Sequence, residues 1–105
     1  MPNGESKNWI RFQLSLESFR GLYNHWPTKI SVYSFFIEEL KEKFSSEDFN
    51  KINSKIKLIP DDDHPFLCCD DLGNKFDYSR DSSPKEFSNK RATDWLEVEE
   101  PNYYD

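Results

Sequence analysis

The sequence predicts one domain of the α+β class, in which a small antiparallel sheet packs against one main amphipathic helix and two or three shorter helices. Three patterns support this class: alternating apolar residues over 9–16, a helical apolar repeat over 29–44, and a strand-turn-strand pattern over 66–79. The sheet is expected to combine the N-terminal strand with the C-terminal hairpin. A length of 105 residues allows one hydrophobic core. The polar segments 1–7 and 99–105 are expected to be flexible tails.

The first expected element is a strand over residues 9–16. Apolar side chains alternate there with Arg11, Gln13 and Ser15, and a period of two is typical of a strand with one buried face. A short helix is expected next, because apolar residues recur at three- and four-residue intervals until Pro27 ends the pattern. These apolar residues are Phe19, Leu22, Tyr23 and Trp26.

The main amphipathic helix is expected over residues 29–44, where apolar residues repeat at helical spacing and charged residues occupy the opposite side. The apolar set is Ile30, Tyr33, Phe36, Ile37, Leu40 and Phe44. Ser45 then offers an N-cap for a second short helix, which would point Phe49 and Ile52 inward. Residues 56–59 fit either the end of that helix or a short strand.

A β-hairpin is expected over residues 66–79, with its turn at 71–74, where Gly and Asn accommodate a positive φ. A further helix is expected from about residue 84, because Ser83 is a suitable N-cap and Pro84 a suitable first helical residue. The end of this helix is open, since residues 95–98 fit either a last helical turn or a short strand.

The charge is unevenly distributed along the chain, which carries a net charge of −6 at pH 7. Residues 1–59 hold nine Lys or Arg and seven Asp or Glu, a net charge of +2, whereas residues 60–105 hold five and thirteen, a net charge of −8. Phosphate backbones are bound by clustered Lys and Arg, so the acidic half disfavours direct nucleic-acid binding. An acidic surface attracts basic partners instead, although acidic residues also keep a small aromatic-rich protein soluble.

Several features predict a cytoplasmic protein that makes no membrane contact. No stretch approaches the ~18 apolar residues of a membrane span, and residues 1–7 lead into no apolar signal-peptide segment. The two cysteines, Cys68 and Cys69, are adjacent, and a disulfide between neighbours is strained. A reducing compartment is therefore expected.

Residues with metal-binding or catalytic chemistry gather between Asp61 and Asp71. Their spacing matches no known site, because adjacent cysteines on a strand point to opposite faces and only one can face the core. The aspartates also lack the Gly and Glu positions of a calcium loop, and acidic neighbours make a thiolate scarce. We therefore expect no enzyme, metal or cofactor. The alternative is a small enzyme or metal-binding protein centred on His64, Cys68 and Cys69.

The leading interpretation is a protein-interaction module, an inhibitor or regulator, whose acidic half docks on a basic surface of a partner protein. Large aromatic residues are interleaved with acids there, and aromatic residues anchor interfaces while carboxylates orient a basic partner. Carboxylates along a ridge can also mimic phosphates and occupy a nucleic-acid-binding groove. The predicted contact residues are Asp61, Asp62, Asp63, Asp70, Asp71, Asp77, Tyr78, Asp81, Glu97, Glu99 and Glu100.

In general character the chain is similar to bacterial immunity proteins, nuclease inhibitors and phage-encoded blockers. It shares their small size, acidity, α+β class and lack of a catalytic signature. This resemblance implies an inhibitor or adaptor. A subunit of a larger complex is a further alternative, and the sequence leaves the oligomeric state open.

Overall fold

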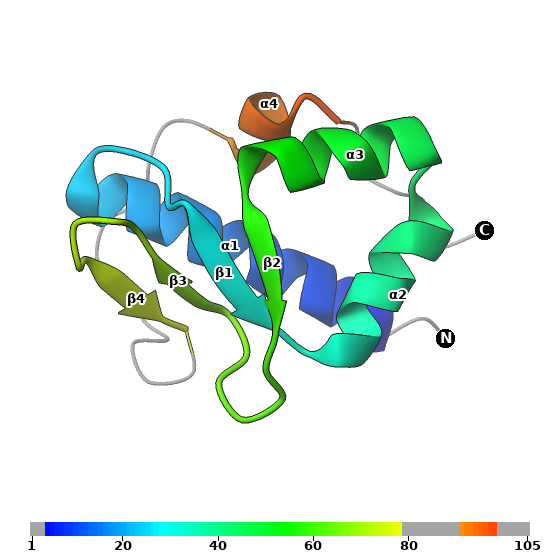
Figure 1. Cartoon of the computed structure of the whole chain (residues 1–105), viewed down its shortest axis with the longest axis horizontal. Coiled ribbons are helices and arrows are strands. Elements are labelled where there is room, and N and C mark those ends of the chain that lie inside the picture. The colour runs from blue at the N-terminus through cyan, green and yellow to red at the C-terminus, as the bar shows by residue number, and fades with distance from the viewer. Residues whose placement is uncertain (1–3, 79–90, 99–105) are drawn as a thin grey trace.

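The computed structural model describes residues 4–78 and 91–98 of the chain, with side chains from residue 8 onward. The described residues form four helices and four strands (Figure 1). In chain order these are α1 (Gly4–Tyr23), β1 (Lys29–Val32), α2 (Ser34–Lys43), α3 (Ser46–Lys55), β2 (Lys57–Pro60), β3 (Leu67–Cys69), β4 (Lys75–Asp77) and α4 (Ala92–Leu96). The predicted α+β class is confirmed.

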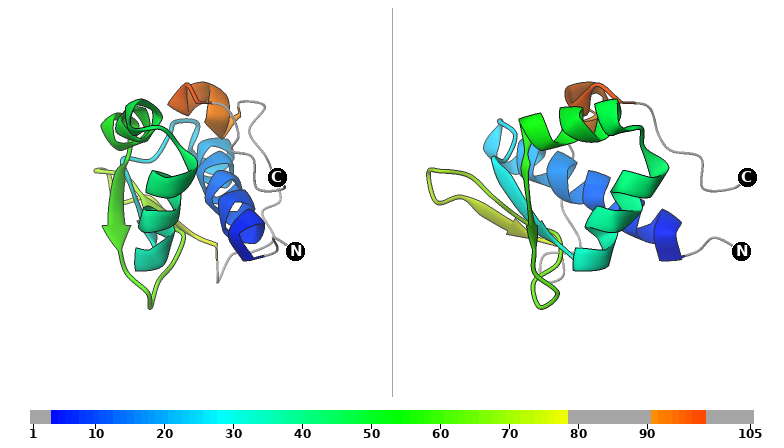
Figure 2. Two further views of the ribbon diagram at one scale, coloured as in Figure 1. Left: turned by 90° about the vertical axis from the view of Figure 1, so that its right-hand side faces the viewer. Right: turned by 45° about the vertical axis from the view of Figure 1, so that its right-hand side comes forward.

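The sheet is mixed, with the strand order β2-β1-β3-β4. β1 pairs in parallel with β2, where Ile30 lies opposite Leu58, and antiparallel with β3, where Ile30 lies opposite Cys68. β3 and β4 form an antiparallel hairpin, with Cys68 opposite Phe76. Helix α1 lies behind the sheet in a separate layer, while α2 and α3 lie beside β2 (Figures 1 and 2). The predicted all-antiparallel sheet is therefore corrected to a mixed one.

The predicted N-terminal strand over residues 9–16 is wrong, because this segment forms the middle of α1. The buried residues Trp9, Phe12, Leu16 and Phe19 follow the helical period, whereas Ile10 is 48% exposed. The alternation of apolar residues therefore does not indicate a strand here. The helical period of 3.6 residues determines which side chains pack against the sheet. The short helix expected over 19–26 is the end of α1, which stops at Tyr23.

The single helix predicted over residues 29–44 is divided into β1 and α2. Ile30 and Val32 point into the core from the strand, and the chain turns at Tyr33 into the helix. The side chain of Asp62, 28 residues further on, accepts a hydrogen bond from the Ser34 amide at 2.8 Å. A cap supplied from so far along the chain cannot be recognised in a local pattern.

The remaining predicted elements agree with the structure where it describes them. Ser45 caps α3 as predicted, accepting a hydrogen bond from the Asp48 amide at 3.1 Å. Residues 57–60 form a strand, and residues 92–96 form a helical turn. The helix expected from residue 84 and the tail over 99–105 lie outside the described residues.

The core between α1 and the sheet is built largely from aromatic rings. Phe12 packs against Phe36 with ring centroids 5.5 Å apart, and Phe36 against Phe66 at 5.8 Å. Two contacts attach α4 to this core. The carboxylate of Glu17 accepts a hydrogen bond from the Ala92 amide at 3.0 Å, and Trp95 stacks on Trp26 with ring centroids 4.5 Å apart. Among the described helices, none has both the length and the apolarity needed to cross a bilayer.

Candidate functional site

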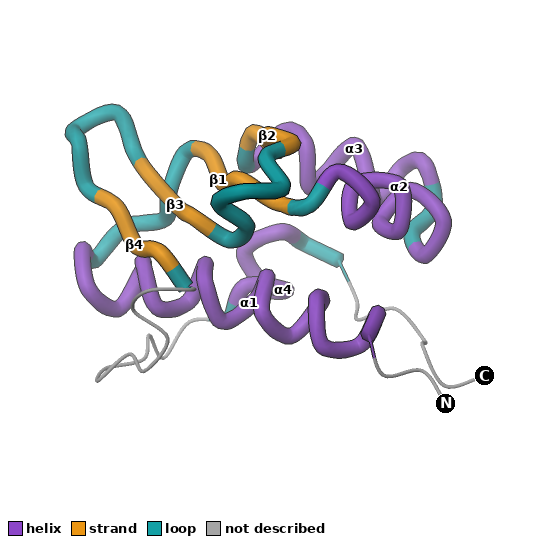
Figure 3. The backbone as a smooth tube through the Cα atoms, turned by 90° about the horizontal axis from the view of Figure 1, so that it is seen from below, coloured by secondary structure: helices purple, strands orange, loops and turns teal. Residues whose placement is uncertain are grey.

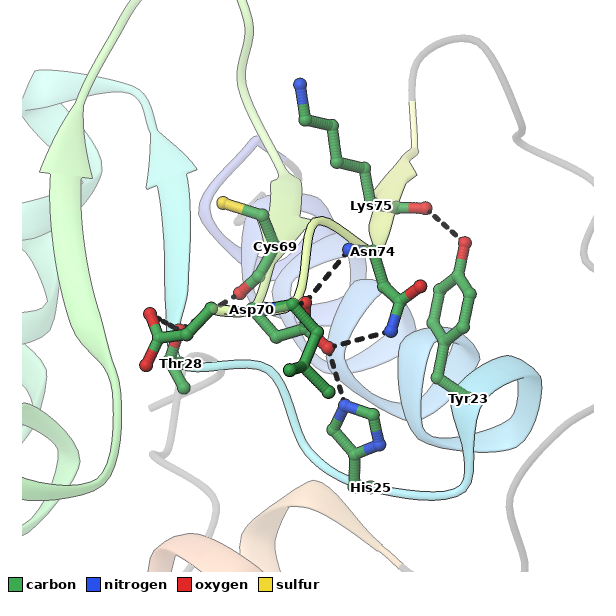
Figure 4. A network of polar contacts seen from close by, with 9 residues as sticks. Tyr23, His25, Thr28, Cys69, Asp70, Asn74 and Lys75 are labelled. Atoms are coloured by element: carbon green, nitrogen blue, oxygen red, sulfur yellow. Dashed lines mark hydrogen bonds and ion pairs between the residues drawn. The ribbon is translucent and has the colours of Figure 1, made fainter.

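Asp70 is the centre of a polar network at the turn between β3 and β4 (Figure 4). Its Oδ1 accepts hydrogen bonds from the amides of Leu72 and Asn74, both at 2.9 Å. Its Oδ2 accepts one from Asn74 Nδ2 at 3.0 Å and pairs with Nε2 of His25 at 2.6 Å. One carboxylate therefore fixes both ends of the five-residue turn 70–74, which we call the hairpin tip.

The local sequence explains why the hairpin tip takes this conformation. The short side chain of an aspartate reaches the backbone amides two and four residues later, which is the usual way in which Asp closes a turn. Gly73 has a φ of +94°, a value that an L-residue adopts only with strain. The amide of Asp70 also donates to the carbonyl of Asn74 at 3.2 Å, so the tip is closed by backbone and side chain together.

The end of α1 and the segment that follows it contact the hairpin through Tyr23 and His25. Asn24, with a φ of 66°, turns the chain out of the helix and brings His25 against Asp70. The hydroxyl of Tyr23 donates to the carbonyl of Lys75 at 2.7 Å. Both contacts join residues more than 40 positions apart, so the tip is anchored by tertiary structure as well as by its own turn.

The Asp70 carboxylate is closed off from solvent, with a side chain that is only 3% exposed, and yet it stays ionised. Burial by itself would raise the pKa of Asp70, but the hydrogen bonds from His25, Asn74 and Leu72 outweigh burial and hold the pKa well below its usual range. The side chain of His25 is 42% exposed and covers the carboxylate. Asp70, a predicted contact residue, therefore positions the tip and does not form its outer surface.

The hairpin tip presents two side chains to solvent. Leu72, at the apex, is 81% exposed. Asp71 is also exposed, and the Thr28 hydroxyl lies 3.5 Å from its Oδ1. Among the described residues, His25 forms its hydrogen bond with Asp70 and none with a hydroxyl or thiol.

Two residues of the alternative metal or catalytic site, Cys68 and Cys69, point to opposite faces of β3, and the third, His64, lies in the loop before this strand. Cys68 is fully buried and Cys69 half-buried, as the alternation of faces predicted. Burial raises the pKa of the Cys68 thiol, and the neighbouring Cys69 adds to this effect. His64 lies in the loop at the other end of β3, 3.4 Å from Asp61. Within the described ranges, no group of three His, Cys, Asp or Glu side chains could hold a metal ion.

The aspartate loop, residues 61–64, lies at the opposite end of β3 from the hairpin tip (Figure 1). Oδ1 of Asp61 accepts hydrogen bonds from the amides of Asp63 at 3.0 Å and His64 at 3.2 Å. The bond from Asp63 is the main cause of the lowered pKa of Asp61, against an opposing effect of burial. Asp62 caps α2, and Asp63 is exposed.

The other predicted contact residues lie elsewhere. Asp77 and Tyr78 lie at the end of β4 and directly after it. Glu97 follows α4, where Lys55 is 2.9 Å away and lowers the pKa of this carboxyl. Asp81, Glu99 and Glu100 lie outside the described residues. The described residues among the predicted contacts are therefore divided among the hairpin tip, the aspartate loop with the neighbouring end of β4, and the end of α4.

Two residues of the site were missed by sequence reasoning. Leu72 lies within the predicted turn, and an apolar residue between Asp71 and Gly73 was itself a signal that a bulky side chain would be held in solvent. His25 had no such signal, because its partner Asp70 is 45 residues away.

Comparison of the chain with protein-family models, with curated proteins and with solved structures found no match.

Proposed function

We propose that the protein is a small protein-interaction module, an inhibitor or regulator, that docks its hairpin tip on a basic surface of a partner protein. The exposure of Leu72 carries this proposal, because this side chain is 81% exposed at the apex of a turn that Asp70 fixes.

Single exposed leucines are common on protein surfaces. Leu72 differs because the turn that holds it is fixed by hydrogen bonds at both of its ends. A preorganised loop loses little conformational entropy on binding, so more of the interaction energy is kept as affinity. A rigid aliphatic apex of this kind fits an apolar pocket on a partner.

The charge beside Leu72 supports a basic rim around that pocket. Asp71 is exposed and adjacent to the apex, where its carboxylate would meet Lys or Arg of the partner. Asp63, at the other end of β3, is exposed as well. Carboxylates of this kind speed the encounter with a basic surface even where they make no close contact. The proposed role is one of binding and not of catalysis.

The test is affinity purification from the native host with three forms of the chain: wild type, Leu72→Ala and Leu22→Ala. Leu22 is a matched control, because it is 49% exposed on α1, away from the hairpin tip. We expect wild type and Leu22→Ala to retain the same partner. With that partner purified, Leu72→Ala should bind roughly 10- to 100-fold more weakly, the loss expected for a buried leucine side chain. Equal affinity of Leu72→Ala and wild type would overturn the proposal.

A second variant tests the charge of the partner surface. Asp71→Asn should slow association with the purified partner and flatten its dependence on salt concentration, because one steering charge is removed. Asp94→Asn, an equal change at an exposed site on α4, is the control. If Asp71→Asn left both the association rate and the salt dependence unchanged, the partner surface would not be basic.

A further inference from the structure

The face of the sheet away from α1 carries a row of lysines. Lys29 lies opposite Lys57 on one side and opposite Cys69 on the other, and Cys69 lies opposite Lys75. Residues opposite each other in neighbouring strands point to the same face. We call Lys57, Lys29 and Lys75 the lysine row, in which Cys69 occupies the place between Lys29 and Lys75.

The burial of the neighbouring residues shows which face this is. Ile30, Cys68 and Phe76, which follow or precede the row along each strand, are buried in the core against α1. The lysine row must then point the other way, and Figure 3 shows none of the described helices on that side of the strands. In Figure 4 the side chains of Cys69 and Lys75 extend away from His25 in the same direction. The lysine row therefore lies on the face of the sheet that no described helix covers, which we call the open face.

The described strands place three lysines and one carboxylate, that of Asp77, on this face of the sheet. Lys41, Lys51 and Lys55 on the helices form ion pairs with nearby acids, whereas Lys29 and Lys57 have no acidic residue opposite them in the sheet. Like charges directly opposite each other on a sheet are destabilising, as for Lys29 and Lys57. An anion bound between these ammonium groups would remove that repulsion. Within the described residues, a protein with a net charge of −6 thus carries an excess of positive charge on this face of the sheet.

An aliphatic row runs beside the lysine row. Ile59 and Leu67 lie opposite Ser31 from the two sides, one pleat repeat or about 7 Å further along the strands, and Asp77 lies opposite Leu67 at the end of this row. Ile59 and Leu67 are half-buried and so remain partly available on the open face. This face therefore carries a cationic row and, beside it, a row with two aliphatic side chains that ends at Asp77.

We infer that the open face of the sheet binds an acidic segment of a partner protein, whose carboxylates meet the lysine row and whose aliphatic side chains meet Ile59 and Leu67. The inference rests on the proposed role as an interaction module and adds a second surface to it, chemically distinct from the hairpin tip. A nucleic acid fits less well, because neither row offers an aromatic side chain on which bases could stack.

The test uses a fluorescein-labelled peptide of eight residues that alternates glutamate with leucine, and follows its binding by fluorescence anisotropy at low and at physiological salt. The triple variant Lys29→Gln, Lys57→Gln and Lys75→Gln should bind the peptide about tenfold more weakly than wild type, and with a flatter salt dependence. The control is the triple variant Lys41→Gln, Lys43→Gln and Lys51→Gln, which makes the same charge change on α2 and α3. It should bind like wild type.

Cys69 gives a readout at the site itself. Its thiol is half-buried within the lysine row, whereas Cys68 is fully buried, so a disulfide reagent such as DTNB should react first with Cys69. The bound peptide should slow this reaction severalfold. Cys69→Ser, which removes the accessible thiol, should abolish the fast reaction and so identifies its source.

Three results would overturn the inference. The first is peptide affinity that is equal in wild type and in the variant of the lysine row. The second is that a single-stranded oligonucleotide of eight nucleotides binds more tightly than the peptide and that its binding requires the lysine row. This result would assign the face to nucleic acid. The third is light scattering that shows a dimer of wild type and a monomer of the variant, which would assign the face to a second copy.

The inference and the proposed function fail separately. Leu72 is part of the hairpin tip and not of the two rows, so Leu72→Ala should leave peptide binding unchanged. If the variant of the lysine row binds the peptide normally while Leu72→Ala still loses the partner, the inference about the open face is wrong and the proposed function of the hairpin tip stands.

Discussion

The hairpin tip and the aspartate loop lie at opposite ends of β3 and use the same local device. Oδ1 of Asp70 accepts from the amides two and four residues later, and Oδ1 of Asp61 from those two and three residues later. Their burial differs, however. The side chain of Asp70 is 3% exposed, against 37% for Asp61.

The difference comes from what covers each carboxylate. His25 and the side chain of Asn74 also contact the Asp70 carboxylate, whereas the contacts of the Asp61 carboxylate come from its own loop. An aspartate that closes a turn in water exchanges one set of hydrogen bonds for another, so its net contribution is small. When a buried aspartate is removed, water cannot reach its hydrogen-bond donors, and these donors are left unsatisfied. The same residue type is thus buried and structural at one end of the strand and accessible to solvent at the other.

The strongest test of this contrast is Asp70→Ala compared with Asp61→Ala. Removing the Asp70 carboxylate leaves the amides of Leu72 and Asn74 without their acceptor in a covered site. We expect the melting temperature to fall by about 10 °C for Asp70→Ala and by much less for Asp61→Ala, measured by circular dichroism at pH 7. Equal losses in the two variants would mean that burial does not separate the two turns.

Acid should remove the contribution of Asp70 to the stability of the folded protein. The folded state holds the pKa of Asp70 well below its usual range, whereas the unfolded chain has a pKa of about 3.9 there. The stabilisation is therefore fully present above about pH 4, and it is lost as the pH falls towards the folded value, because the unfolded state then binds a proton that the folded state does not.

The measurement is the difference in melting temperature between wild type and Asp70→Asn from pH 7 to pH 2. We expect this difference to be constant down to about pH 5 and to narrow below about pH 4. A difference that stayed constant to pH 2 would show that the charge of Asp70 is not what stabilises the hairpin tip.

A smaller effect is expected at Gly73. A Cβ at this position would meet nothing within 4 Å, so the cost of Gly73→Ala comes from its φ of +94° alone. We expect a loss of about 1–2 kcal/mol in the free energy of unfolding, measured by urea denaturation. Gly73→Asn is the control, because asparagine adopts a positive φ more readily and should cost less. If alanine were no worse than asparagine, the backbone of the tip would not be under this constraint.

In the aspartate loop, the larger effect should come from Asp62, whose carboxylate caps α2 through the amide and hydroxyl of Ser34. Asp62→Ala should lower the free energy of unfolding by about 1 kcal/mol, as the loss of an N-cap does elsewhere. Urea denaturation is again the measurement. A variant as stable as wild type would show that α2 does not depend on this distant cap.

The smallest effect on stability is expected for Asp63→Asn. Asp63 is exposed, and surface substitutions of this kind change the free energy of unfolding by less than about 0.5 kcal/mol. Its effect should appear in the rate of association with a basic partner, which should fall while the melting temperature stays unchanged. A clear loss of stability in Asp63→Asn would show that Asp63 has a structural role, as Asp70 does.

Local features of the fold could be predicted from the sequence because their causes lie within a few residues. The Ser45 cap joins residues three apart, and the hairpin turn depends on Asp, Gly and Asn within five positions. The burial of Cys68 with the partial exposure of Cys69 follows from the alternation of side chains along one strand. These interactions are the same in any fold that contains the segment.

Helix α1 could not be predicted in this way, because it is buried on more than one side. Asn8, Gln13, Ser15, Glu17 and Ser18 are buried along with the apolar residues. Polar residues at buried positions weaken the apolar stripe by which an amphipathic helix is recognised. Over residues 9–16 the alternation of apolar residues was then the clearer pattern.

What the sequence by itself determined is the α+β class, the Ser45-capped helix, the hairpin and the opposite faces of the two cysteines. Only the tertiary structure decided that residues 29–32 form a strand, since β1 obtains its hydrogen bonds from β2 and β3. It also decided the roles of the aspartates, because His25 reaches Asp70 across 45 positions and Asp62 reaches Ser34 across 28. A carboxylate in a run of acids has no fixed role until the chain brings donors and burial to it, and those come from distant residues.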